Sequence, residues 1–557
     1  MELIRELFRL QHKHGHLSET TLRAFSAEKN VPLYRLEELV SFYPHFRRTA
    51  APKVTIQLCR DVCCRMAEGQ SYSAQLFESF QHDPDVEIES VSCLGRCDST
   101  PAAAVNDRPI APFSMGEHEA MKAFIAHARE GNVYKADLEQ TLLGKYRCDP
   151  YLYNDPNSHF GTILQLLSSR KNIAEHCIPV LKESGLKGMG GAGFPTGLKW
   201  ELVGKEAATP KYVICNADES EPGTFKDREI LRSLPHLVVE GMLLAGLTVG
   251  AKKGIVFLRH EYVPERENLA ECLKYADDKG ILGENAAGSG QRFDIEIFDS
   301  PGGYILGEET ALLECLEDKR GEPRNKPPYP GSVGLWGKPT LINNVETFAL
   351  ATAIIHHGND WWQNQGKDEF AGLKFVCISG DIENPGVYEI PVGTTVQELI
   401  DLAGGMRENR KLLAFLPGGA SSNFLPAEKV ATPLEFKAMQ QAGSMLGTGA
   451  VVVFDETRNL FDLATNLVEF FRNESCGKCV PCRVGSEKAV QLLEAVEAGV
   501  TPATELLHLT ELGETMELTS ICGLGQVALN PVLSMLKHFP ESVPHSGESP
   551  QMTGDSK

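Results

Sequence analysis

The sequence lacks any uninterrupted apolar run long enough to cross a bilayer. Its nearest approach, residues 237–251, is interrupted by Glu240 and by glycines. The first sixteen residues, MELIRELFRLQHKHGH, are amphipathic and have neither the apolar core nor the small-residue cleavage site of a secretion signal. We therefore expect a protein that stays in the cytoplasm and inserts no segment into the membrane.

Positive charge is also scarce, with 54 Lys and Arg residues against 75 Asp and Glu residues and a net charge of −21. This balance argues against nucleic acid as the main partner and gives no membrane-surface signal. No internal repeat is evident. At 557 residues, of which 42% are hydrophobic, the chain is too long for one core. We expect about three to five structural units.

Cysteine, in contrast, is plentiful: the chain has 15. In a chain without a secretion signal they indicate metal chemistry rather than disulfides. Nine of them fall into two groups, one near each end. The other six are scattered, and we expect them to be small buried apolar residues: Cys148, Cys177, Cys215, Cys272, Cys315 and Cys377.

The C-terminal group lies in SCGKCVPCR, residues 475–483. Cys476, Cys479 and Cys482 have C-x2-C-x2-C spacing, and Cys522 in SICGLG is the best candidate for a fourth thiolate. A triplet closed by one remote cysteine is the commoner pattern for a [4Fe-4S] cluster. Zinc and unliganded structural thiols are the alternatives, and clustered free thiols would be an oxidation liability.

The N-terminal group follows two alternating, strand-like stretches, one of which leads into Cys59 and the other into Cys93. The pairs Cys59-x4-Cys64 and Cys93-x3-Cys97 would then meet at one sheet edge, an arrangement that suits a [2Fe-2S] cluster. Cys63 competes with Cys64 for one ligand position. Zinc is again an alternative, and a thioredoxin-type disulfide is disfavoured because this segment has no C-x-x-C.

Residues 185–200, GLKGMGGAGFPTGLKW, are rich in glycine. They contain G-x-G-x-x-G at Gly188, Gly190 and Gly193, which is weak evidence alone. Because Pro195 follows too closely for an ordinary dinucleotide-binding helix, we do not expect a standard Rossmann fingerprint. The glycines do let backbone N–H groups approach a phosphate or a flat ring, with Lys199 available to meet negative charge. A purely structural turn is the alternative.

A polar segment, NADESEPGTFKDRE, follows the apolar stretch 212–215. Asn216, Asp218, Glu219 and Glu221 would then lie at the carboxyl end of a strand, where open α/β sheets bind ligands. A solvated charged surface is the alternative interpretation. The bracketing by an apolar strand and by Pro222-Gly223 favours the rim of a site.

Further polar groups follow downstream. Glu308 and Glu309 are expected in the first turn of a helix, where a structural role through the helix dipole competes. Lys326 and Tyr329 stand together in KPPYP. TLINNVET adds two amides and a hydroxyl, from Asn343, Asn344 and Thr347. An aromatic ring beside a lysine and amides suits a stacked, phosphate-bearing cofactor.

Past residue 370, two strands around the turn Asn384-Pro385-Gly386, a helix after Thr394 and a strand at 451–454 predict a compact β-grasp-like insert. Apolar residues at helical spacing over 460–471 predict a helix that ends just before Cys476, and Thr501-Pro502 is expected to start another.

These motifs carry a specific resemblance. Residues 165–540 resemble the 51 kDa-type subunit of respiratory complex I, which oxidises NADH and binds FMN and a [4Fe-4S] cluster, and its relatives in NAD-linked hydrogenases and formate dehydrogenases. Residues 1–130 resemble the 24 kDa-type, thioredoxin-like [2Fe-2S] subunit, a separate chain in complex I. Their fusion resembles the diaphorase subunits of NAD-reducing hydrogenases and some NAD-dependent formate dehydrogenases. The matching motifs are GMGGAGFPTGLKW, NADESEPGTFKDR, GEETALLE, RNKPPYP, KPTLINNVET, ESCGKCVPCRVG and SICGLG.

The resemblance implies a multidomain α/β protein with a Rossmann-like FMN- and NADH-binding domain. The expected units are a helical collar at 1–48, a thioredoxin-like [2Fe-2S] domain at 49–130, a linker at 131–165, the FMN and NADH domain at 166–370, a β-grasp (SLBB-like) domain at 371–455, a helical [4Fe-4S] domain at 456–540 and a disordered tail at 541–557.

The resemblance also implies roles for individual residues. Positions that contact the flavin are Gly188, Gly190, Gly191, Lys199, Asn216, Asp218, Tyr304, Gly307, Asn343, Asn344 and Thr347. Positions that hold NADH are Phe194, Glu221, Glu308, Glu309, Lys326 and Tyr329, with Phe194 and Tyr329 as stacking surfaces and Glu221 as the catalytic candidate. Leu306, where many relatives have Cys, and the extra Cys63 depart from the family pattern.

The sequence therefore predicts a diaphorase subunit with FMN, NAD(H), a [4Fe-4S] cluster and a [2Fe-2S] cluster. It would exchange electrons with a partner catalytic subunit, and a formate dehydrogenase is favoured for that role over a hydrogenase or complex I. No residue suggests a molybdopterin, tungsten or nickel site, so that chemistry would belong to another chain. An electron relay without NADH turnover and a zinc-binding scaffold are the alternatives.

Overall fold

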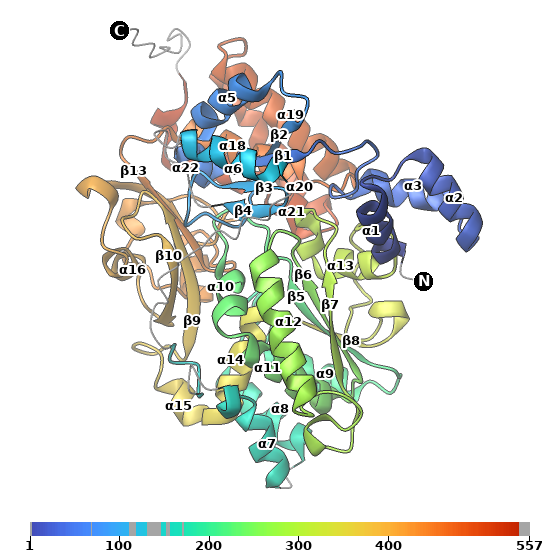
Figure 1. Cartoon of the computed structure of the whole chain (residues 1–557). Helices are drawn as coiled ribbons and strands as arrows, with labels where there is room; N and C mark the ends of the chain where they lie inside the picture. Colours follow the sequence, from blue (N-terminus) through green and yellow to red (C-terminus); the bar gives the residue numbers. More distant parts are fainter. Residues whose placement is uncertain are drawn as a thin grey trace.

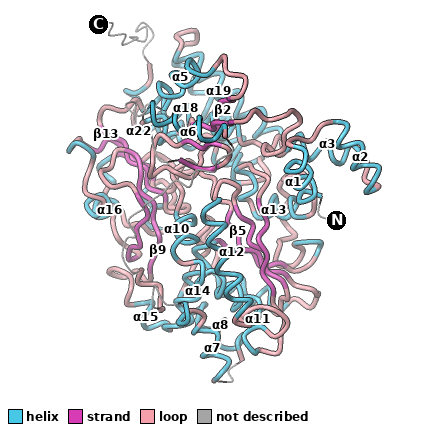
Figure 2. The backbone as a smooth tube through the Cα atoms, viewed as in Figure 1, coloured by secondary structure: helices cyan, strands magenta, loops and turns pink. Residues whose placement is uncertain are grey.

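The computed structural model describes residues 3–67, 69–110, 118–130, 146–151, 156–169 and 172–544. Three sheets and two groups of helices make up this part of the chain. In Figure 1 the first sheet and the C-terminal helices lie together at the top, above the central sheet, and the third sheet lies beside the central helices. Figure 2 shows the strands of the central sheet running side by side.

Three short helices open the chain: α1 (Leu3–His14), α2 (Glu19–Lys29) and α3 (Leu33–Phe42). Ser18 caps α2, because its side chain accepts a hydrogen bond from the backbone N–H of Thr21 at 3.1 Å. The helices pack against the central unit, where the Tyr43 hydroxyl donates to the carbonyl of Lys319 at 2.6 Å. The expected helical collar is thus fastened to a segment almost 280 residues away.

The first sheet has the order β2-β1-β3-β4. β1 and β2 are parallel, with Cys59 opposite Val91, so both strands deliver the chain to the same sheet edge. Helices α4 to α6 accompany the sheet, and α4 packs against α18 of the C-terminal unit. The elements are β1 (Val54–Cys59), α4 (Val62–Met66), α5 (Gly69–Phe80), β2 (Val86–Val91), β3 (Ala103–Val105), β4 (Arg108–Ile110) and α6 (His118–Arg129).

The central sheet is entirely parallel, with the order β7-β6-β5-β8. Its strands are β5 (Tyr212–Ala217), β6 (Lys253–Leu258), β7 (Asp294–Asp299) and β8 (Thr340–Asn344). All four carboxyl ends therefore meet at one edge, which is where the sequence places most of its polar candidates.

Helices surround the central sheet. α11 is buried along its whole length, which explains why its sequence is apolar on every side. The helices of this unit are α7 (Gly161–Ser168), α8 (Ile173–Ser184), α9 (Thr196–Lys205), α10 (Lys226–Ser233), α11 (Pro235–Val249), α12 (Val263–Asp278), α13 (Glu309–Leu316), α14 (Val345–His357) and α15 (Asn359–Gln363).

No single helix among the described residues is both long and apolar enough to span a membrane. α10 and α11 meet that length and composition only as a pair, and they are bent by 94° relative to one another.

The predicted linker is only partly described, since residues 131–145 and 152–155 lie outside the described residues. Its described part is packed rather than solvated. Cys148 and Tyr151 are buried, and α7 begins at Gly161, inside the range expected to be a connector. The Tyr151 hydroxyl donates to Glu240 of α11 at 2.6 Å, so this segment adheres to the central helices.

Glu240 gives this contact a pH dependence. Burial raises the pKa of the Glu240 carboxyl from its ordinary 4.5 to about 7, although hydrogen bonds from Tyr151 and from the Ile163 backbone oppose the shift. The folded chain therefore holds this proton more tightly than the unfolded chain does. The protonated Glu240 carboxyl contributes fully to stability below pH 4.5, and this contribution is lost as the pH rises through 7. The free energy of unfolding changes by about 3 kcal/mol at most.

We expect the Glu240→Gln variant to have a flatter dependence of thermal midpoint on pH between 5 and 8 than the wild type. The measurement is thermal unfolding at several pH values. Glu408→Gln, at an exposed side chain, is the control and should reproduce the wild-type curve. Parallel curves for wild type and Glu240→Gln would contradict the raised pKa of the Glu240 carboxyl.

The third sheet has the order β10-β9-β13-β11-β12, and its last-added strand, β13, lies between β9 and β11. Thr395 and Glu398 form a capping box at the start of α16. The elements are β9 (Leu373–Gly380), β10 (Gly386–Pro391), α16 (Val396–Leu402), β11 (Leu412–Leu416), β12 (Leu425–Pro426), α17 (Phe436–Ala442) and β13 (Ala450–Asp455). The expected strands of the β-grasp-like insert are present.

Five helices close the described chain: α18 (Leu460–Asn473), α19 (Val480–Glu497), α20 (His508–Thr519), α21 (Gly523–Val527) and α22 (Asn530–His538). The helix expected after Thr501-Pro502 begins as a 3-10 turn, Ala503–Leu507, and becomes α-helical only at His508. Of the predicted tail, residues 545–557 lie outside the described residues.

Candidate functional site

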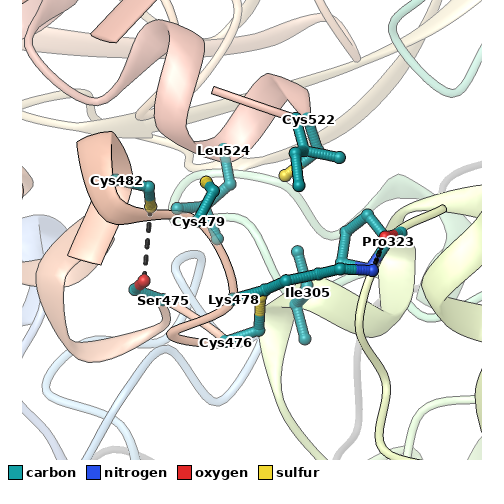
Figure 3. A pocket seen from close by; sticks show the side chains of 10 residues that line it. Ile305, Pro323, Ser475, Cys476, Lys478, Cys479, Cys482, Cys522 and Leu524 are labelled. Atoms are coloured by element: carbon teal, nitrogen blue, oxygen red, sulfur yellow. Dashed lines mark hydrogen bonds between the residues drawn. The ribbon is translucent and has the colours of Figure 1, made fainter. Parts of the chain in front are cut away.

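The four C-terminal cysteines line one pocket (Figure 3). Cys476 lies in the loop after α18, Cys479 caps α19, Cys482 lies in the first turn of α19, and Cys522 caps α21. The remaining wall is largely apolar and is formed by Ile305, Pro323, Ile521 and Leu524. The helices thus bring the remote fourth cysteine to the triplet.

This donor set fits a [4Fe-4S] cluster, because four sulfur atoms converge in a pocket whose other walls hold few competing ligands. Burial raises the pKa of the Cys482 thiol to about 11 and that of the Cys522 thiol to about 12. Backbone N–H groups of Leu524 and Gly525 oppose the second shift. A side chain at Gly525 would meet Cβ of Cys482 at 2.8 Å, so glycine leaves room there.

The N-terminal cysteines also converge, at the shared carboxyl edge of β1 and β2. Cys59, Cys64, Cys93 and Cys97 are buried, and the Cys93 and Cys97 sulfur atoms lie 3.5 Å apart. Cys59 contacts both Cys64 and Cys93. Backbone N–H groups point at three of the sulfur atoms, from Ala102 to Cys64, from Gly95 to Cys93 and from Gly223 to Cys97. Such donors stabilise thiolates, so the set fits a [2Fe-2S] cluster.

Cys63 lies in the same group. It contacts Cys97, and its sulfur is 3.4 Å from the hydroxyl of Ser379 in the third sheet. Cys64 instead lies beside Cys59 and receives the N–H of Ala102 at 3.3 Å. All fifteen cysteines of the chain are free thiols, and the six scattered ones are buried or nearly so, as expected.

We expect Cys64→Ser to lose about two iron atoms per chain, the content of one [2Fe-2S] cluster, and Cys63→Ser to keep them. The reason is that Cys64 pairs with Cys59, whereas Cys63 faces a serine hydroxyl. Iron analysis and visible absorbance of the anaerobically purified variants provide the measurement. Cys177→Ser, in α8, is the control. Iron loss in Cys63→Ser instead would reverse the assignment.

The N-terminal cluster site docks directly on the segment that follows β5. The Gly223 N–H donates to the Cys97 sulfur at 3.3 Å, and Gly223 stands two residues after Glu221. Arg259, at the end of β6, donates to the carbonyls of Cys93 and Glu219. The loop that bears Cys93 and Cys97 therefore contacts the polar segment 216–228 directly.

Buried ion pairs complete this interface. Arg228 pairs with Asp98, and Arg96 pairs with Glu265 at 3.4 Å. All four side chains are at most 8% exposed. Arg228 also donates to the carbonyl of Gly95 at 2.5 Å. The interface thus depends on charged groups removed from water rather than on apolar contacts alone.

The glycine-rich loop lies between α8 and α9. Its ends are joined where the Gly188 N–H donates to the Phe194 carbonyl at 2.8 Å. No strand leads into it, so the standard Rossmann fingerprint is absent, as expected. α9 begins directly after Pro195, beyond the glycines, because proline is well tolerated at a helix N-terminus. A Cβ on Gly190 would lie 3.2 Å from Cβ of Asn344, so the loop approaches β8 closely.

Asn216 and Asp218 lie at the carboxyl end of β5. The Asn216 side chain donates to the carbonyl of Gly307 at 2.8 Å, and Asp218 accepts hydrogen bonds from Ser220 and Ser300, each at 2.9 Å. Burial raises the pKa of the Asp218 carboxyl to about 7, while Arg259 and the two serines oppose the shift. The loops after β5 and β7 are therefore fastened together at the predicted site.

Glu221 and Tyr304 approach one another across the same edge. Glu221 accepts the N–H of Ser421 at 2.8 Å, and burial raises the pKa of the Glu221 carboxyl to about 7. The Tyr304 hydroxyl lies 3.4 Å from the hydroxyl of Ser421. The nearby Glu221 carboxylate adds to the effect of burial in raising the pKa of Tyr304. Both residues thus contact the third sheet unit through one serine.

The predicted NADH-holding residues include a compact charged group. The Lys326 ammonium lies 2.9 Å from Glu308 and 2.8 Å from Glu309. Burial opposes this charge, but the two carboxylates outweigh it and raise the pKa of Lys326. Glu308 is the N-cap of α13 and accepts the N–H of Thr310 at 2.8 Å, so it also stabilises the start of this helix. The expectation that both glutamates open a helix is confirmed.

Two aromatic rings and one half-buried lysine accompany this group. Phe194 is 43% exposed and Tyr329 is 61% exposed, so both have ring surface available for stacking. The Lys199 ammonium lies 5.8 Å from the centre of the Phe194 ring and donates to the carbonyl of Ile342 at 3.1 Å. Burial lowers the pKa of Lys199.

Asn343, Asn344 and Thr347 are already engaged with the protein. Asn343 accepts the indole N–H of buried Trp200 at 3.1 Å, and Thr347 accepts the N–H of Met189 in the glycine-rich loop at 2.9 Å. Asn344 caps α14. These contacts fix the loop against β8.

Sequence reasoning missed a buried charge network next to Asn344. Lys226 is fully buried; its ammonium lies 2.7 Å from Asp227, 3.0 Å from Glu346 and 3.2 Å from Asn344. Glu219, considered only as part of a rim, accepts the backbone N–H groups of Asp227 and Arg228 and is buried. In the sequence, Lys226 and Asp227 of KDRE resemble the solvated start of a helix. Only the match to the family motif could have indicated that they belong to the site.

Glu474 was also missed, although it directly precedes the C-terminal cysteine motif. Its carboxylate accepts the backbone N–H of Tyr304 at 2.8 Å and the hydroxyl of Ser92. Ser92 immediately precedes Cys93. One side chain thus connects the loop of Tyr304 with both cysteine sites.

Four family matches cover most of the chain. They are the thioredoxin-like [2Fe-2S] ferredoxin family at residues 1–127, the Nuo51 FMN-binding domain at 181–353, the SLBB domain at 375–424 and the NADH-ubiquinone oxidoreductase-F iron-sulfur binding region at 462–545. Both cysteine groups and the glycine-rich loop fall within the matched regions. The donor sets described above fit the cofactors of these domains.

Curated relatives and a solved structure indicate the same kind of protein as these four family matches. The chain is 44% identical over 364 residues to the F subunit of NADH-quinone oxidoreductase from Escherichia coli, covering 65% of this chain and 82% of that protein. It is 43% identical over 375 residues to the F 2 subunit of the same enzyme from Rhizobium meliloti, covering 66% of this chain and 89% of that protein. A crystal structure of NAD+-reducing [NiFe]-hydrogenase matches with a TM-score of 0.81 and 31% identity, covering 96% of this chain and 91% of that one. The chain therefore belongs to the family of the NADH-quinone oxidoreductase F subunits, the FMN and iron-sulfur oxidoreductases that act on NADH, with a thioredoxin-like [2Fe-2S] unit at its N-terminal end.

Proposed function

We propose that this chain is the diaphorase subunit of a larger redox enzyme, in which it exchanges electrons between NAD(H) and a partner catalytic subunit. FMN and the two clusters, when bound, supply the conversion between the electron pair of a hydride and single electrons. The chain's own residues supply binding, orientation and a water-poor surrounding.

In this proposal the carboxyl edge of the central sheet holds both FMN and NAD(H). The glycine-rich loop with Lys199, and the groups of Asn216, Asp218, Tyr304 and Gly307, surround the flavin. Asn343, Asn344 and Thr347 hold the glycine-rich loop in place. Phe194 and Tyr329 offer stacking surfaces, and Lys326 with Glu308 and Glu309 forms the polar end of the NAD(H) site. Glu221 orients the nicotinamide.

The observation that carries the proposal is the continuity of the three sites. Glu474 contacts the loop of Tyr304 and the strand end before Cys93, and it stands two residues before Cys476. On the other side, Gly223 contacts Cys97 directly. A scaffold for zinc alone would not require a nucleotide-sized polar edge between two cysteine sites.

The test is ferricyanide reduction by NADH with the full anaerobic holoprotein and its Glu221→Gln variant. We expect wild-type turnover, and a KM for NADH raised about tenfold or more in the variant, the loss of a hydrogen bond to a charged group. FMN content should not change. Glu408→Gln, far from this edge, should behave as wild type. Absence of turnover in a protein that holds FMN would favour the electron relay, and a colourless zinc protein would favour the scaffold.

For the partner, we propose a formate dehydrogenase catalytic subunit; the diaphorase subunits of hydrogenases share the same motifs. The second candidate is a hydrogenase subunit, which the match of 96% of this chain to a chain of NAD+-reducing [NiFe]-hydrogenase supports. The cytoplasm remains the proposed location. The test is an anaerobic pull-down of the tagged chain. Molybdenum or tungsten with formate-dependent NAD+ reduction would establish the first candidate, nickel with hydrogen-dependent reduction the second, and a set of membrane subunits a complex I arrangement.

A further inference from the structure

A cluster of metal-ligating side chains lies outside the sites described above. His45 follows α3, Asp107 is in the turn between β3 and β4, and His260 follows β6. Three parts of the chain that are separate in sequence thus bring two imidazoles and a carboxylate together. The nearest ligand atoms of the three residues all lie within 4.8 Å of one another.

The two imidazoles are arranged side by side. Their rings stack with centroids 3.8 Å apart and an angle of 23° between the planes. Glu261 is a neighbouring carboxylate, and one of its oxygens lies 3.9 Å from Nε2 of His45. Its other oxygen is held by Arg259 at 2.9 Å, which fixes the orientation of the carboxylate.

The surrounding backbone holds this arrangement in place. A Cβ at Gly302 would lie 2.4 Å from Cδ2 of His45, and Gly302 has a φ of +89°, so glycine is required for the approach. Asp107 itself has a φ of +63° in its tight turn. In the described part of the chain, no protein hydrogen bond occupies the ring nitrogens of His45 or the carboxylate of Asp107. These atoms are available to a ligand.

We propose that His45, His260 and Asp107 form a zinc-type divalent metal site that joins the helical collar, the first sheet and the central sheet. Imidazole nitrogen and carboxylate oxygen are ligands that Zn2+ takes in tetrahedral protein sites. Metal binding would draw these ligand atoms, which lie within 4.8 Å of one another, closer together and would turn the two stacked imidazoles so that a nitrogen of each points at the ion. The chemistry is distinct from that of the two cysteine sites, which offer sulfur.

The test uses the full holoprotein with its iron-sulfur clusters, washed with a chelator and then dialysed against zinc. We expect about one additional zinc per chain, absent in His260→Gln and weakened about tenfold or more in Asp107→Asn. Asp107 is on an exposed turn, so that variant tests the site even if His260→Gln folds poorly. His508→Gln is the matched control, because His508 is an exposed histidine 3.3 Å from a carboxylate of its own helical turn.

X-ray absorption at the zinc edge identifies the ligands. Nitrogen and oxygen neighbours at about 2.0–2.1 Å support the proposal, whereas sulfur neighbours at about 2.3 Å would place the zinc in a cysteine site and overturn it. Zinc binding no greater in the wild type than in His260→Gln, with equal iron content in both, would also overturn it.

Discussion

The Cys522→Ser variant should lose the C-terminal cluster while NADH oxidation by the flavin site stays intact. Cys522 is the remote ligand of the pocket in Figure 3, and a serine hydroxyl is a poor substitute for a thiolate. We expect about four iron atoms fewer per chain. Ferricyanide reduction should continue, whereas electron transfer to or from the partner subunit should fall about 100-fold or more.

The measurement combines iron analysis, the electron paramagnetic resonance spectrum of the reduced protein, and the two activities. Cys272→Ser, on α12 and away from both cysteine groups, provides a control for the loss of a thiol. Unchanged iron in Cys522→Ser would show that another residue completes the cluster site.

Replacing Lys226 by methionine should lower the free energy of unfolding more than any of the other substitutions named above. The ammonium is fully buried between Asp227 and Glu346, at 2.7 and 3.0 Å. Removing it deprives buried Asp227 of its ammonium partner and leaves Glu346 only the ammonium of Lys374, at 3.3 Å, so we expect a cost of about 3–5 kcal/mol. For a unit of this size the thermal midpoint should fall by about 10 °C. Circular dichroism and flavin fluorescence during heating provide the measurement.

Lys205→Met is the matched control. Its ammonium also contacts a carboxylate, Glu201 at 2.9 Å, but the lysine side chain is 70% exposed. Solvated pairs of this kind contribute less than about 1 kcal/mol, so the midpoint should hardly change. Equal losses in the two variants would show that burial of the Lys226 network does not govern stability.

Local sequence was sufficient for much of the fold and for the convergence of the cysteines in two groups. The spacing of Cys476, Cys479 and Cys482 predicted one site because residues three apart in a loop and helix start point the same way. Strands that run into Cys59 and Cys93 predicted a shared edge because parallel neighbours end together, and β1 and β2 are such a pair. In the structure the same geometry places Asn216 and Asn344 side by side on β5 and β8, a pairing that the sequence analysis did not predict.

Contacts that depend on packing between distant segments could not be predicted. Nothing near Glu474 indicates that its carboxylate reaches both Tyr304 and Ser92, respectively 170 and 382 residues away. The engagement of Asn343 by Trp200 was equally hidden, since an amide in a cofactor motif suggests a ligand rather than a packing partner.

The buried ion pairs between the N-terminal unit and the central unit have a consequence for assembly. Pairs such as Arg228 with Asp98 and Arg96 with Glu265 lose hydration when they form, so they add little net affinity between separate molecules. On one polypeptide the same contact is intramolecular, at an effective concentration of about millimolar. Dilution therefore cannot separate the two units, and each flavin site has its own [2Fe-2S] unit in fixed one-to-one proportion.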